Sequence, residues 1–66
     1  MERRKVSCEV SKKCSDIIKT WATERNIRCF RSECYNNIYV EMELNETEIK
    51  EVNKIIDEYY AKTEVA

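Results

Sequence analysis

Four cysteines are the residues of this chain best suited to chemistry. A thiolate is a good metal ligand and nucleophile, so converging cysteines could bind zinc or form a redox pair. We expect Cys8, Cys14 and Cys34 to face inward at one end of a sheet and Cys29 to face outward. The spacings match no metal-ligand motif, the chain has no histidine, and buried cysteine is a common small apolar residue. A thiol-based metal or redox site is therefore a second alternative function, and we predict no metal or cofactor.

Two acidic residues offer the other conventional chemistry, general acid and base catalysis. Glu41 and Glu43 are two residues apart, so they would share one face of a strand. We expect that face to be open to water with Arg31 nearby, which favours a solvated surface. Catalytic proton transfer most often uses histidine, and phosphate loops need glycine, but the chain contains neither residue. We therefore predict a protein that is not an enzyme.

Basic side chains are concentrated in the first half of the chain. Residues 1–36 contain nine basic and five acidic residues, and residues 37–66 contain three basic and eight acidic residues. The acidic second half would repel phosphate, and no nucleic-acid-binding motif is present. Nucleic-acid binding is thus the first alternative function. The residues that would contact phosphates are Arg3, Arg4, Lys12 and Lys13.

The chain length is enough for one domain, which we assign to residues 1–66. A chain this short buries only about 60% of the surface that its unfolded form exposes, so its core is thin. The basic start at residues 1–5 is not followed by the apolar segment of a signal peptide, and no apolar run could span a membrane. We expect a cytoplasmic protein with free thiols and no membrane partner.

The clearest structural pattern is the alternation of apolar and polar residues over residues 38–44. This period of two predicts a half-buried strand. A first strand over residues 3–10 alternates in the same way, with Val6, Cys8 and Val10 facing inward. The apolar side of the later strand consists of Ile38, Val40, Met42 and Leu44, and its other side of Tyr39, Glu41 and Glu43.

Two amphipathic helices complete the predicted elements. The first is capped by Ser11 and ends near Asn26, and the second is capped by Asn45, with Glu48 completing a capping box, and ends near Lys62. Residues at helical spacing give each helix one buried face. In the first helix this face comprises Cys14, Ile17, Ile18, Trp21, Ala22 and Arg25. In the second it comprises Ile49, Val52, Ile56, Tyr59 and Thr63, with Ile55 and Tyr60 at its margins.

The second strand, residues 27–34, has an ambiguous pattern. A two-residue turn at the paired asparagines would bury Arg31 and Glu33 without partners, which is unfavourable. We therefore predict a three-residue loop over residues 35–37. The chain has no glycine, so we expect Asn37 to take the left-handed backbone conformation that this loop requires.

This register decides which residues of the second strand face the core. It places Arg31 opposite Glu41 on the outer face, which is a favourable cross-strand pair. A slip by one residue would reverse every side chain of the strand. The predicted pairs on the buried face are Phe30 with Met42, Ser32 with Val40, and Cys34 with Ile38.

The predicted order of elements is β-α-β-β-α. A right-handed crossover puts both helices on one face, and the most apolar strand belongs in the middle. We therefore predict an α+β two-layer sandwich with a three-stranded antiparallel sheet of order 1-3-2. This resembles the ferredoxin-like split β-α-β arrangement without its last strand, a fold that implies no particular function. Metal-carrying domains of that architecture have a Cys-x-x-Cys motif before the first helix, whereas five residues separate Cys8 from Cys14.

The sheet face without helices is the surface most suited to a partner. Tyrosine and arginine among charged residues are typical of protein interfaces. The residues that we expect on this face are Ile27, Cys29, Arg31, Glu33, Tyr39, Glu41 and Glu43. We predict a protein-binding module in which the partner contacts Arg31, Tyr39, Glu41 and Glu43.

Two further expectations concern the kind of partner. The first and second strands are both sheet edges, so strand addition by a partner or by a second copy is possible, and a homodimer would thicken the core. By analogy of size, the chain is expected to be a regulator or inhibitor, a class that includes phage-encoded inhibitors of host or defence proteins.

Overall fold

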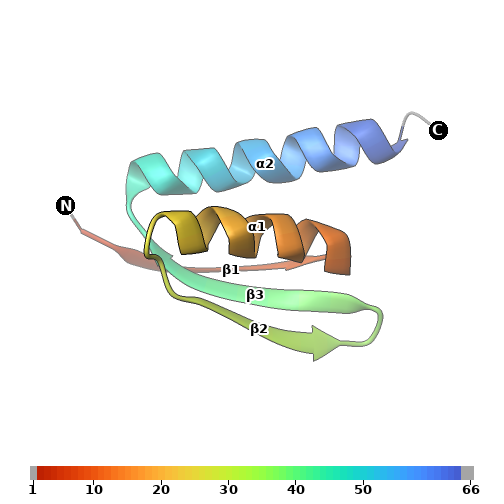
Figure 1. The fold of residues 1–66 in the computed structure, drawn as a ribbon, viewed down its shortest axis with the longest axis horizontal. Helices are drawn as coiled ribbons and strands as arrows, with labels where there is room; N and C mark the ends of the chain where they lie inside the picture. The colour runs from red at the N-terminus through yellow and green to blue at the C-terminus, as the bar shows by residue number, and fades with distance from the viewer. Residues whose placement is uncertain (1, 65–66) are drawn as a thin grey trace.

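The computed structural model describes residues 2–64 and the side chains of residues 2–62. Three antiparallel strands form one sheet of order β1-β3-β2, and two helices pack against one of its faces (Figure 1). The predicted α+β architecture, element order and strand order are confirmed. The elements are β1 (Arg4–Val10), α1 (Lys12–Glu24), β2 (Cys29–Cys34), β3 (Asn37–Leu44) and α2 (Glu46–Glu64).

Helix α1 begins and ends where hydrogen bonds satisfy its terminal backbone groups. The Ser11 hydroxyl accepts a hydrogen bond from the Cys14 N–H at 3.3 Å, as expected of an N-cap. At the other end Asn26 takes a positive φ of 58°, and the Ile27 N–H donates to the Ala22 carbonyl at 2.8 Å. This is a Schellman motif, with Ile27 packed into the core just beyond the helix.

Helix α2 begins with the predicted capping box. The Asn45 side-chain oxygen accepts from the Glu48 N–H at 2.8 Å, and the Glu48 carboxylate accepts from the Asn45 N–H at 2.9 Å. Thr63, which we expected on the buried face, lies outside the described side chains. No helix within residues 2–64 is long and apolar enough to cross a membrane.

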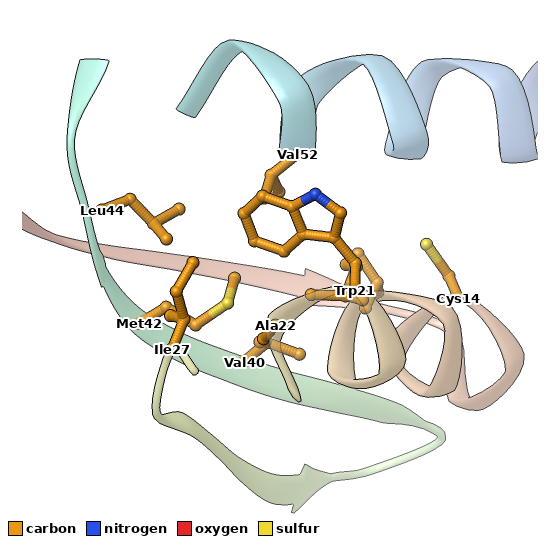
Figure 2. Packing of buried hydrophobic residues seen from close by; sticks show 10 residues of the cluster. Cys14, Trp21, Ala22, Ile27, Val40, Met42, Leu44 and Val52 are labelled. Atoms are coloured by element: carbon orange, nitrogen blue, oxygen red, sulfur yellow. The ribbon is translucent and has the colours of Figure 1, made fainter. Parts of the chain in front are cut away.

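The core lies between the helices and the inner face of the sheet. Figure 2 shows the Trp21 indole directed from α1 towards Val52 of α2, above the side chains of β3. Ile17 was predicted on the buried face of α1 but is 46% exposed, because the core contacts only part of that helix. The buried apolar residues are Val10, Cys14, Ile18, Trp21, Ala22, Ile27, Val40, Met42, Leu44 and Val52.

The predicted register between β2 and β3 is wrong by one residue. The turn contains two residues, Tyr35 and Asn36, so Cys34 pairs with Asn37 instead of Ile38. The left-handed residue is Tyr35, with a φ of 57°, and not Asn37. The one-residue shift reverses the inward and outward sides of β2.

The reversal places Phe30 outside the core and turns Arg31 towards the helices. Phe30 pairs with Glu41 and is 61% exposed, whereas Arg31 pairs with the buried Val40. Burial of Arg31 was considered unfavourable because no partner was foreseen. In the structure Arg31 lies at the sheet edge, where its guanidinium is 2.6 Å from the Asp16 carboxylate of α1.

Three other residues of this region also differ from the prediction. Ile27 is buried, Cys29 pairs with the buried Met42, and Glu33 pairs with Ile38, so none of the three lies on the face away from the helices.

Candidate functional site

The sheet face away from the helices is the candidate functional surface, and we call it the open face. Each strand contributes alternate residues to it, because the intervening residues face the core. None of these open-face residues is fully buried. They are Lys5, Ser7 and Glu9 of β1, Phe30, Ser32 and Cys34 of β2, and Asn37, Tyr39, Glu41 and Glu43 of β3.

Two aromatic side chains form the apolar part of the open face. Phe30 is 61% exposed and Tyr39 is 40% exposed. Phe30 pairs with Glu41, two residues from Tyr39 on the neighbouring strand, so the two aromatic residues are diagonal neighbours. Such neighbours lie about 7–8 Å apart, within reach of aromatic rings. The strand register therefore places both residues in one exposed region of the open face, which we call the aromatic patch.

Charged residues surround this aromatic patch. Lys5 lies directly opposite Glu43 across the β1–β3 pair, which favours an ion pair between them. Glu9 lies opposite Tyr39 and accepts a hydrogen bond from the Asn37 amide at 3.4 Å. An apolar centre with a charged margin is the usual composition of a protein interface.

The open face is hollowed where β2 begins. A shallow cavity of about 440 Å³ lies there, with Phe30 as its main aromatic wall. The lining contains both positively and negatively charged side chains. The cavity therefore suits a polar or amphipathic side chain of a partner better than a multiply charged anion. The charged lining residues are Arg3, Lys5, Arg28, Glu41 and Glu43.

Of the four predicted partner-binding residues, three lie on the open face and one does not. Tyr39, Glu41 and Glu43 alternate with the buried residues of β3 and face outward. Arg31 lies on the opposite face, where it contacts Asp16 and, at 3.4 Å, the Ser15 hydroxyl. The residue that sequence analysis missed is Phe30, because a large apolar side chain was expected in the core.

The four basic residues considered for nucleic acid do not gather at one place. Arg3 and Arg4 lie at the start of β1, and Lys12 and Lys13 follow its other end. A seven-residue strand is about 20 Å long. The Arg3 guanidinium is also occupied, since it donates to the Glu48 carboxylate at 2.9 Å and to the Glu43 carbonyl at 3.1 Å.

The cysteines are arranged differently from the prediction. Cys8 and Cys14 lie on the core side, as expected, but Cys29 joins them and Cys34 lies on the open face. Within the described residues, no group of three cysteine or acidic side chains is placed to hold a metal ion.

The environment of three cysteines favours the neutral thiol. Burial raises the pKa of Cys8, Cys14 and Cys29. For Cys8 and Cys14 a neighbouring cysteine raises the pKa further, whereas Arg31 and Lys19 partly oppose the effect of burial at Cys29. A protonated thiol is a poor nucleophile and a poor metal ligand, so these positions suit packing better than chemistry.

Comparisons of this chain with protein-family models, with curated proteins and with solved structures found no match.

Proposed function

We propose that the chain is a non-enzymatic protein-binding module whose open face covers part of a partner protein's surface. The observation that supports this most is the exposure of Phe30 beside Tyr39 on a sheet face that no described helix covers. Large aromatic residues supply much of the binding free energy of protein interfaces. Burial of these two exposed aromatic side chains against a partner would contribute favourable binding free energy, because it removes apolar surface from water.

The charges of the open face favour protein over nucleic acid. Glu9, Glu41 and Glu43 share the face with the aromatic patch and would repel phosphates. A protein surface of mixed charge could pair with these carboxylates and with Lys5. Nucleic-acid binding stays an alternative prediction, with weaker support because its basic residues lie at both ends of β1.

A module of this size would act by occupying a surface that its partner uses for something else. We therefore propose a regulator or inhibitor that works in the cytoplasm without a membrane partner. A phage origin is part of the same proposal and rests only on the analogy of size.

The proposal is tested by quantitative affinity capture from nuclease-treated extract of the native host. Three baits are compared: the wild type, a Phe30→Ser, Tyr39→Ser variant, and a Tyr35→Ser control. Tyr35 is fully exposed in the turn and lies outside the open face as defined here, so the control loses an exposed aromatic residue without changing the open face. Thermal unfolding verifies that every bait is folded.

We expect one protein to be retained by the wild type and by Tyr35→Ser, and to be depleted at least about tenfold with the open-face variant. Equal recovery of that protein with all three folded baits would show that the open face is not the binding surface. Specific recovery from untreated extract that is lost in the nuclease-treated extract would favour the nucleic-acid alternative instead.

A further inference from the structure

Strand β1 is the less protected of the two sheet edges. In the described part of the chain it pairs only with β3, so the N–H and C=O groups along its other edge are open to another strand. At the centre of its inner side Val6 and Cys8 are apolar and only half-buried, and the one inward charge of the strand, Arg4, lies at its first position. The edge strand β2 instead directs two charged residues, Arg31 and Glu33, to its inner side away from its first residue, and inward charges discourage strand addition.

Helix α2 runs along β1 and offers apolar surface beside this edge. Near its start Glu48 forms an ion pair with Arg3 at 2.9 Å, just before β1 begins. Near its end the Tyr60 hydroxyl accepts a hydrogen bond from the Ser11 N–H at 3.0 Å, just after β1 ends. Among the described side chains of this helix, only Val52 is buried. Its partly buried apolar residues are Ile49, Ile55, Ile56, Tyr59 and Tyr60.

We propose that β1 pairs in an antiparallel fashion with β1 of a second copy, about a two-fold axis through Ser7. Paired residues point to the same side of a sheet, so this axis is perpendicular to the sheet and keeps all helices on one face. The two sheets become continuous, and the two α2 helices approach each other above the new strand pair. This inference uses the edge of β1 and does not require the proposed function, although Lys5 and Glu9 belong to the open face.

Strand length and charge select the register. When the axis passes through Ser7, the centre of β1, all seven residues of the strand find a partner. Lys5 then faces Glu9 of the second copy, and symmetry forms this opposite-charge pair twice. On the inner side Val6 faces Cys8 of the second copy, which removes two half-buried side chains from water. An axis through Cys8 would place Glu9 opposite Ser7 and shorten the overlap.

The charge pairs give the first test, which is analytical ultracentrifugation over the micromolar to millimolar range. Lys5→Glu and Glu9→Lys each replace two attractive pairs by two repulsive ones, so each variant alone should dimerise roughly tenfold or more weakly than the wild type. An equimolar mixture of the two variants should recover association, because every pair is again of opposite charge. A wild type that is monomeric throughout, or two single variants that dimerise normally, would overturn the proposal.

A cross-link tests the register without changing any charge. Ser7→Cys places a thiol on the two-fold axis, and mild oxidation should give a dimer whose intermolecular disulfide joins the two substituted positions, as mapped by mass spectrometry. Ser32→Cys is the matched control, because Ser32 is an exposed serine on the same face of the other edge strand. Cross-linking through position 32, or equal cross-linking at both positions, would show that β1 is not the pairing edge.

Discussion

A tyrosine occupies the backbone conformation that glycine adopts most easily. Tyr35 has a φ of 57° in the β2–β3 turn, and its side chain is fully exposed. For a residue with a Cβ atom, this left-handed conformation costs roughly 1–2 kcal/mol. No packing contact of an exposed side chain offsets that cost, so the turn stores strain at this position.

Tyr35→Gly should therefore stabilise the fold. We expect the free energy of unfolding to rise by about 1 kcal/mol, because glycine adopts a positive φ without steric strain. Urea denaturation followed by circular dichroism measures the change. Tyr35→Ala is the control, since it removes the ring but keeps the Cβ atom, and it should give no comparable gain. If alanine and glycine stabilise equally, side-chain exposure rather than backbone strain explains the effect.

The partly buried thiols should make the fold sensitive to alkaline pH. Burial raises the pKa of Cys8 and Cys29 above its ordinary value, which is about 8.5 in an unfolded chain. As the pH rises through that value, the unfolded state releases thiol protons that the folded state still holds. The free energy of unfolding should therefore fall with increasing pH above this value.

The alkaline effect is measured by urea denaturation at several pH values above neutrality. A Cys8→Ala, Cys29→Ala variant should lose less stability over the same pH range than the wild type, because it lacks two of the thiols whose pKa burial raises. Identical pH profiles would contradict the inferred effect of burial on these two thiols.

At the scale of the elements, segments with a clear hydrophobic period were predicted correctly. The register of β2, whose pattern is ambiguous, was not. The alternation along β3 and the caps Ser11 and Asn45 correctly predicted a strand and two helix starts. Strand β2 has no clean alternation, so its register depended on the judgement that Arg31 could not face inward. That judgement failed because the contact between Arg31 and Asp16 joins residues fifteen positions apart, and no local pattern reveals it.

The start of α2 provides a test of one element. Asn45→Ala removes the acceptor of the Glu48 N–H and should lower the free energy of unfolding by about 1 kcal/mol. Asn53→Ala is the matched control, because Asn53 is an exposed asparagine in the interior of the same helix, where alanine is favoured. Denaturation curves of both variants give the comparison. An equal loss of stability in the two variants would contradict a capping role for Asn45.

At the scale of the whole molecule, the core is thin because α2 contributes a single buried side chain among its described residues. Domains of this size rarely gain more than about 3–5 kcal/mol from one hydrophobic core. The loss of one large core side chain should therefore remove most of the stability, while the partly covered α2 offers surface for a second copy.

Two adjacent isoleucines of α1 test this account of the core. Ile18 is fully buried and Ile17 is 46% exposed. Ile18→Ala should cost about 2–5 kcal/mol and leave the chain largely unfolded, whereas Ile17→Ala should cost much less. Thermal unfolding followed by circular dichroism measures both. Similar losses in the two variants would place the core boundary elsewhere on α1.

The proposed binding function depends on the claim that β2 turns Phe30 outward and Arg31 inward. Cross-strand nuclear Overhauser effects in the isotope-labelled protein test this claim most directly, because paired backbone protons of neighbouring strands lie close together. The structure predicts contacts of Cys29 with Met42 and of Arg31 with Val40. Contacts of Phe30 with Met42 and of Ser32 with Val40 would contradict it, because Phe30 would then face the helices and Tyr39 alone would remain of the aromatic patch.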